Sequence, residues 1–156
     1  MKNKKGKTNL KILLATDGST LSKVVLEKIS NRAYPPKTEM RVVSVYENIP
    51  MITTLEPMGV SQEYYISTDK YAIKTAEKIT KNAADILHKK NPELAITTTV
   101  INGSPKRVIL EEAEKFGADL IIVGSHGSGA LERFLLGSVS QAVALHAKCS
   151  VEIIRK

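Results

Sequence analysis

Short runs of apolar residues alternate along this chain with longer stretches whose apolar residues recur at helical spacing. The short runs are rich in Ile, Leu, Val and Thr, end at turn-forming residues, and cover positions 11–16, 39–46, 94–101, 119–123 and 150–155. Such runs predict five β-strands. Most of them are apolar at consecutive positions, which is typical of strands buried on both faces of a parallel sheet.

Four helices are predicted between these strands. The first begins at Ser19 or Thr20, either of which can cap it, and ends before a pair of prolines. The others are expected over residues 68–90, 105–116 and 138–147, the third of the four with proline at its start and glycine after its end. The order of elements is therefore βαβαβαβαβ.

The second predicted helix and the segment before it differ in pattern. Tyr71, Ile79 and Ile86 recur at helical spacing, so we expect this stripe to lie in the core. Residues 47–67 contain two prolines and a glycine and show no clear period, so we expect a long mobile loop there.

This alternation predicts a single α/β domain built on an open parallel sheet with helices on both faces. In such sheets the ligand binds beyond the carboxyl ends of the strands, where the strand order reverses direction. The turns after the first and fourth strands, at Asp17 and Gly124, are therefore where we expect a site.

The composition fits one domain and narrows the class of protein. The chain has 156 residues, 42% of them hydrophobic, and its apolar runs are far shorter than the roughly 20 residues that span a membrane. The single cysteine, Cys149, cannot form an internal disulfide, and the three histidines are too scattered to suggest a metal site. We expect a soluble, cytoplasmic protein without metal ligands of its own.

The net charge of +7 is concentrated at the amino terminus. Five of the 23 basic residues lie among the first eleven positions, so residues 12–156 carry 18 basic and 16 acidic residues. We expect residues 1–8 to form a flexible basic tail and residues 9–156 to form the domain. Nucleic-acid binding through the tail is an alternative that no RNA-binding signature supports.

The segment after the fourth predicted strand is rich in glycine and serine. Gly124, Gly127 and Gly137 precede a helix, and Ser138 and Ser140 could add hydroxyl donors. Glycines let the backbone approach a bulky anion, and a helix start offers N–H groups and a positive dipole end, so this segment suits phosphate. The lysine of the usual phosphate loop is absent, which favours binding over fast turnover. The same glycines could instead serve only turns and a helix cap.

The chain resembles the universal stress proteins of the UspA type over nearly its whole length. Nucleotide-binding members of that family carry Gly-x2-Gly-x9-Gly-(Ser/Thr), and Gly124, Gly127 and Gly137 with Ser138 match every spacing. Residues 15–19, 123–127, 135–139 and 146–154 match the family as well. The chain departs from it at three places: Ser44 replaces a frequent histidine, Ser128 and Gly129 stand where an arginine is frequent, and Ser150 replaces a common proline.

The resemblance implies an adenine nucleotide alpha hydrolase-like fold with strand order 3-2-1-4-5, a homodimer formed through the last strand, and ATP as ligand, with Mg²⁺ or Mn²⁺ as candidate ions. It implies that adenine and ribose lie near Ala15, Thr16, Asp17, Val45, Val123 and Gly124. It implies that the phosphates lie near Gly127, Gly137, Ser138, Val139 and Ser140. Asp17 suits a ribose hydroxyl or a base amine, because a carboxylate repels phosphate, although it could instead only cap its turn.

Together these observations predict an ATP-binding regulatory protein of the stress response, with no residue in a catalytic role. A slow ATP-hydrolysing or adenylyl-transferring enzyme is one alternative, although the phosphate-loop motifs of related enzymes are absent. A dimeric interaction protein that binds no nucleotide is the other.

Overall fold

The computed structural model describes residues 9–48, 62–126 and 136–156, with the backbone alone for residues 62–65. Its elements are β1 (Lys11–Ala15), α1 (Thr20–Ser30), β2 (Glu39–Tyr46), α2 (Gln62–Lys90), β3 (Ala95–Asn102), α3 (Pro105–Phe116), β4 (Leu120–Gly124), α4 (Ser138–His146) and β5 (Ser150–Ile154). The predicted order of strands and helices is confirmed. None of the described helices is long and apolar enough to cross a membrane.

The five strands form one parallel sheet in the order β3-β2-β1-β4-β5, as expected. β1 lies at the centre of the sheet, paired with β2 on one side and β4 on the other. The chain thus proceeds outward from β1 in one direction and then returns to continue on the other side. The switch point lies between the carboxyl ends of β1 and β4, where ligands of such sheets bind.

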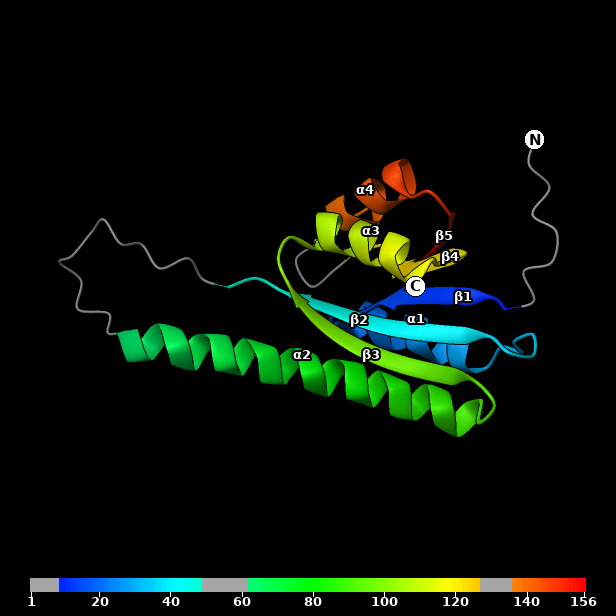
Figure 1. Cartoon of the computed structure of the whole chain (residues 1–156), viewed down its shortest axis with the longest axis horizontal. Coiled ribbons are helices and arrows are strands. Elements are labelled where there is room, and N and C mark those ends of the chain that lie inside the picture. The colour runs from blue at the N-terminus through cyan, green and yellow to red at the C-terminus, as the bar shows by residue number, and fades with distance from the viewer. Residues whose placement is uncertain (1–8, 49–61, 127–135) are drawn as a thin grey trace.

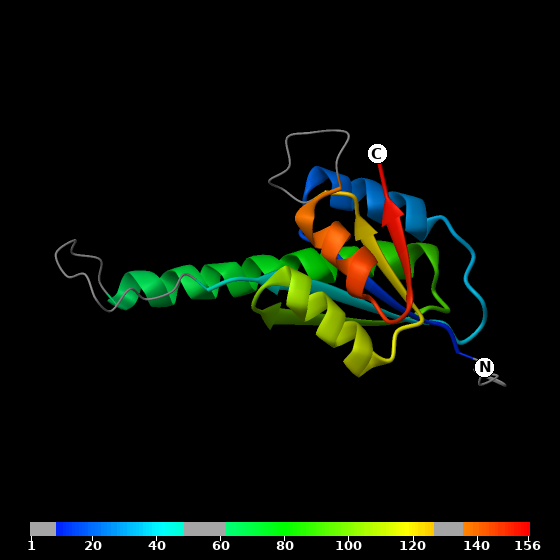
Figure 2. The ribbon, with the colours of Figure 1, turned by 90° about the horizontal axis from the view of Figure 1, so that it is seen from above.

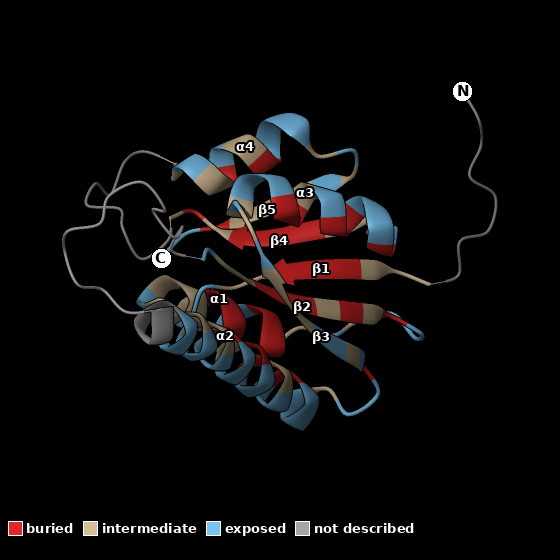
Figure 3. Ribbon diagram, turned by 60° about the vertical axis from the view of Figure 1, so that its left-hand side comes forward, coloured by how far each residue is buried: buried red, intermediate tan, exposed pale blue. Residues whose placement is uncertain are grey.

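Helices cover both faces of the sheet (Figures 1 and 2). On one face Ile12 and Leu14 of β1 pack with apolar residues of α1 and α2, and on the other Leu13 packs with residues of α3 and α4. The three successive residues Ile12, Leu13 and Leu14 are therefore all buried, because a strand between two helical layers has no solvent side. Figure 3 shows this burial concentrated in the central strands.

α2 departs from the sequence prediction in its length and in its buried face. It begins at Gln62 and so takes in six residues that were expected in the loop; residues 49–61 of that predicted loop lie outside the described residues. Tyr71 is 74% exposed and Ile86 is 37% exposed, so placing them in the core was wrong. The buried stripe instead follows Ala76, Thr80, Ala83 and Leu87, and on a helical wheel Tyr71 and Ile86 fall outside it.

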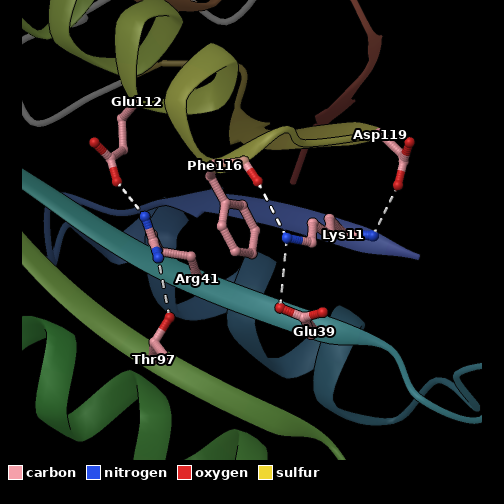
Figure 4. Close-up of polar contacts among 7 residues, drawn as sticks. All are labelled: Lys11, Glu39, Arg41, Thr97, Glu112, Phe116 and Asp119. Atoms are coloured by element: carbon pink, nitrogen blue, oxygen red, sulfur yellow. Dashed lines mark hydrogen bonds and ion pairs between the residues drawn. The ribbon is translucent and has the colours of Figure 1, made fainter. Parts of the chain in front are cut away.

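An aromatic and ionic cluster fixes α3 to the sheet (Figure 4). The Arg41 guanidinium lies over the Phe116 ring, 4.3 Å from its centroid, and its Nη1 donates to Glu112 Oε1 at 2.6 Å. Lys11 Nζ lies 5.0 Å from the centroid of the same ring. Because Glu112 is only 5% exposed, Arg41 provides the charge that a buried carboxylate requires.

A second ion pair fixes the edge strand β5. Arg32, just after α1, donates two hydrogen bonds to the Glu152 carboxylate, at 2.8 and 2.5 Å. These bonds to Arg32 hold the pKa of Glu152 below its ordinary value of 4.5, against the opposing effect of burial. Tyr34 lies nearby, and burial raises the pKa of its phenol above 10.0.

Candidate functional site

A cavity of about 620 Å³ opens at the carboxyl ends of β1, β2 and β4, beside the N-terminus of α4. Its lining residues come from six elements and the turns between them: Ala15, Thr16, Asp17, Ser22, Val43, Val45, Glu47, Pro105, Ile109, Val123, Gly124, His126, Gly137, Ser138, Val139 and Ser140. Its size is that of a small-molecule site, and it lies at the switch point of the sheet.

Ten of the eleven residues expected to form a site line this cavity. The eleventh, Gly127, lies outside the described residues. Sequence reasoning missed six further lining residues, namely Ser22, Val43, Glu47, Pro105, Ile109 and His126. Val43 could have been inferred, since it lies two positions before Val45 and so points to the same face of its strand.

The turn after β1 is held by the Asp17 side chain. Asp17 Oδ1 accepts hydrogen bonds from the Ser19 N–H at 3.0 Å and from the Ser22 hydroxyl at 2.5 Å. Gly18 has a φ of 73°, and Ser19 caps α1 by accepting from the Ser22 N–H at 3.2 Å. The turn-capping role considered for Asp17 is therefore present. The side chain is nevertheless exposed and part of the cavity wall.

Gly137 allows the start of α4 to approach the end of β4. Its N–H donates to the Ser125 carbonyl at 2.6 Å, and a Cβ at this position would lie 3.0 Å from His126 Cα. Since the φ of Gly137 is −62°, glycine is needed here for space and not for a left-handed backbone. The third glycine of the motif thus has a packing role whether or not a ligand binds.

The N-terminus of α4 lines the cavity. The first α-helical hydrogen bond runs from the Gln141 N–H to the Gly137 carbonyl, and no side chain of the described residues caps this end of the helix. The N–H groups of the first turn therefore have no partner within the helix and carry the positive end of its dipole. Ser138 is exposed and Val139 is half-buried at this end. The arrangement suits an anion.

Ser140 differs from Ser138 in what its hydroxyl does. It is 2% exposed, and its Oγ donates to the carbonyls of Ser125 and Gly137, each at 2.9 Å. The hydroxyl is therefore already used to join α4 to the end of β4. Ser125 Oγ in turn lies 2.6 Å from His126 Nδ1, so the same short segment is fixed by both its backbone and its side chains.

The cavity combines an apolar wall with acidic groups. Val43, Val45, Ile109 and Val123 supply apolar surface suited to a flat ring, and the carboxylates of Asp17 and Glu47 supply hydrogen-bond acceptors. Among its described lining residues there is no lysine or arginine. Positive potential within the described wall therefore comes from the start of α4.

Comparisons with known proteins agree with this architecture. The sequence model of the Universal stress protein family matches residues 8–155. The universal stress protein YxiE of Bacillus subtilis is 32% identical over 148 residues, which cover 93% of this chain and 98% of that protein.

Solved structures share the fold. A universal stress protein in complex with cAMP superposes with a TM-score of 0.65 at 22% identity, covering 94% of this chain and 96% of that one. A universal stress protein family protein from Arabidopsis thaliana with AMP bound has a TM-score of 0.66 at 18% identity, covering 94% of this chain and 92% of that one. At such identities the likeness is one of fold.

Proposed function

Because the chain belongs to the universal stress protein family, we propose that it binds an adenine nucleotide in the 620 Å³ cavity and acts as a nucleotide-dependent regulatory protein of the stress response. The observation that carries this proposal is the position of the α4 N-terminus. Its first-turn N–H groups, which have no partner within the helix, belong to residues that line the same cavity as an apolar wall from β2, β4 and α3. A nucleotide needs both, a surface for its base and donors for its phosphate.

The site residues divide between the two ends of such a ligand. Val45 and Val123 would contact the adenine, while Ala15, Thr16, Asp17 and Gly124 would surround the ribose. The N–H groups of Ser138 and Val139 would donate to phosphate, together with Gly137 and, beyond the described residues, Gly127. Ser140 would act indirectly, since its hydroxyl holds the backbone of the cradle in place.

We take ATP as the physiological ligand, accompanied by Mg²⁺ or Mn²⁺. Two carboxylates line the cavity, and each would repel a triphosphate. A divalent ion bound to the phosphates offsets that repulsion without any change in the protein. AMP and cAMP, which carry less charge, are bound in the two related structures. They are therefore the comparison ligands for the test.

The first experiment identifies the ligand directly. The freshly purified chain is denatured, released nucleotide is identified by mass spectrometry, and ATP, AMP and cAMP are titrated calorimetrically with and without Mg²⁺. Recovery of an adenine nucleotide, or saturable binding of one of the three, supports the proposal. If no adenine nucleotide is recovered and none of the three binds to a correctly folded sample, the proposal is refuted.

A matched pair of variants then tests the site. Ser138→Glu places a carboxylate at the start of α4, where it favours the helix dipole but repels phosphate, so we expect at least about tenfold weaker binding without loss of fold. Ser138→Gln introduces a side chain with the shape of glutamate but without its charge. This variant should bind nucleotide normally. Gly137→Val is a poorer test, because its side chain would crowd His126 with or without ligand.

We also propose that the protein is a cytoplasmic homodimer paired through β5. β5 hydrogen-bonds only to β4 among the described strands, which leaves its outer edge open. Light scattering on the purified chain measures the oligomeric state. A monomer at micromolar concentration, both with and without nucleotide, would contradict this pairing.

A further inference from the structure

His126 stands out among the described residues that line the nucleotide cavity. It is the only one of them with a nitrogen atom in its side chain. The other polar side chains of the described wall are the hydroxyls of threonine and serine and the carboxylates of Asp17 and Glu47. His126 is half-buried and directly follows the end of β4. Within the described wall, a side-chain N–H for a phosphate oxygen can therefore come only from this ring.

The residue before it, Ser125, is fixed on every side. It is completely buried, and its N–H donates to the Ile154 carbonyl at 2.9 Å. Its carbonyl accepts from the Gly137 N–H at 2.6 Å and from the Ser140 hydroxyl at 2.9 Å. Its own hydroxyl oxygen lies 2.6 Å from Nδ1 of His126. The hydroxyl therefore reaches the ring from a rigid position.

This contact indicates which ring nitrogen carries the proton. A buried hydroxyl must donate to an acceptor, because leaving its proton unpaired costs free energy. Among the described residues, Nδ1 of His126 is the acceptor that the Ser125 hydroxyl has. The hydroxyl therefore donates and Nδ1 accepts. A neutral imidazole carries one proton, so that proton lies on Nε2.

Nε2 is the ring nitrogen that is left for a ligand. Nδ1 is occupied by Ser125, and Nε2 forms no hydrogen bond with any residue that the structure describes. The ring also stands directly against the start of α4, since a Cβ on Gly137 would lie 3.0 Å from Cα and 3.6 Å from Cβ of His126. The imidazole N–H and the first-turn N–H groups of α4 therefore border the same part of the cavity.

We propose that Nε2–H of His126 donates a hydrogen bond to the phosphate next to the ribose, and that Ser125 orients the ring for this contact. The inference rests on the proposed nucleotide site and adds a side-chain donor to it. AMP, cAMP and ATP all carry this phosphate, whereas adenosine does not. A hydrogen bond to a charged acceptor is stronger than one between neutral groups, so His126 distinguishes a nucleotide from its nucleoside.

The competing explanation is that His126 serves only to accept the buried hydroxyl proton of Ser125. In that case, replacing the histidine changes the stability of the fold and affects all adenine ligands alike. The decisive quantity is therefore the ratio of the AMP affinity to the adenosine affinity. A purely structural histidine leaves this ratio unchanged, and a phosphate ligand does not.

Two substitutions of His126 separate its two nitrogens. The amide of asparagine lies close to the position of Nδ1, so His126→Asn can keep the contact with Ser125 but loses the donor at Nε2. The amide of glutamine reaches the position of Nε2, so His126→Gln keeps a donor for phosphate. By calorimetry on the full chain, His126→Asn should bind AMP about tenfold more weakly or worse, and adenosine within about twofold of wild type. His126→Gln should bind AMP more tightly than His126→Asn.

Two further variants complete the set. Ser125→Ala removes the orienting hydroxyl and should weaken AMP severalfold while leaving adenosine within about twofold of wild type. His88 is exposed on α2 and does not line the cavity, so His88→Asn is the matched control and should bind both ligands as the wild type does.

Nuclear magnetic resonance of the imidazole nitrogens gives a readout that needs no variant to bind. In the free wild type, the ring of His126 should show the tautomer with its proton on Nε2. AMP should shift the Nε2 signal of His126, and adenosine should not. His88 and His146, which are exposed and lie outside the cavity lining, serve as internal references.

Three results would overturn the inference while leaving the nucleotide site intact. One is AMP affinity of His126→Asn within about twofold of wild type. Another is equal weakening of AMP and adenosine, which would show a structural role. The third is a ring proton on Nδ1, or an Nε2 signal that AMP does not move. A folded wild type that binds neither AMP nor adenosine would instead refute the nucleotide site, and this inference with it.

Discussion

Replacing Arg41 by methionine tests whether the cluster at Phe116 holds α3 on the sheet. Methionine approximates the length and apolar stem of arginine but has no charge. The substitution leaves the Glu112 carboxylate, whose side chain is 6% exposed, without the guanidinium that now lies 2.6 Å away. It also removes one of the two cations from the face of the Phe116 ring.

The expected loss is about 3 kcal/mol of unfolding free energy. Removing one partner of a buried ion pair costs about 3–5 kcal/mol, and the lower end applies because the Arg41 side chain is 27% exposed and water can reach the site. The cation–π contact adds about 0.5–1 kcal/mol, which packing of the methionine partly restores. The double variant Arg41→Met/Glu112→Leu removes both charges and should cost less than about 1 kcal/mol.

Urea denaturation followed by circular dichroism measures both variants and the single variant Glu112→Leu, which completes the double-mutant cycle. The double variant should be more stable than Arg41→Met alone, because an unpaired buried carboxylate is worse than none. Arg41→Met within about 0.5 kcal/mol of the wild type would refute the reasoning, since Glu112 would then not depend on Arg41. A double variant no more stable than the single one would refute it as well.

Three further outcomes are expected. Arg32→Gln should lower stability at neutral pH, and its difference from wild type in urea should shrink as pH falls below about 4.5, because the pKa of Glu152 is depressed only in the folded state. Gly117→Ala should cost about 1 kcal/mol, from its φ of 70° alone, with no effect on nucleotide binding. Gly137→Ala should lower the free energy of unfolding, measured by urea denaturation, because its Cβ would lie 3.0 Å from His126 Cα.

Much of the fold could be predicted because its signals are local. The bounds of β2 were predicted to the residue, since a run of β-branched residues lies between clear breaks. Ser19 caps α1 and Gly117 ends α3, as capping chemistry indicated. Tyr71 and Ile86 were misplaced because helical spacing says which residues share a face but not which face meets the sheet.

The cavity, too, could be predicted from the sequence only in part. Asp17, Gly124 and Gly137 could be placed near one another because each follows a strand or precedes a helix whose position in an open α/β sheet is known. Pro105 and Ile109 of α3 could not, because they reach the cavity only through the packing of α3 over β2. Ser140 was expected to offer its hydroxyl to a ligand, and the tertiary structure shows that hydroxyl bonded to two carbonyls.

The sequence by itself determined the α/β class, the order and approximate bounds of the elements, the family, and the glycine spacing at the candidate phosphate cradle. These depend on periodicity, turn chemistry and motif spacing, which are properties of neighbouring residues. Only the tertiary structure decided that Arg41 pairs with Glu112 and that the Ser140 hydroxyl bonds to two carbonyls. Such features depend on contacts between residues far apart in the chain, and those contacts exist only once helices and sheet have packed.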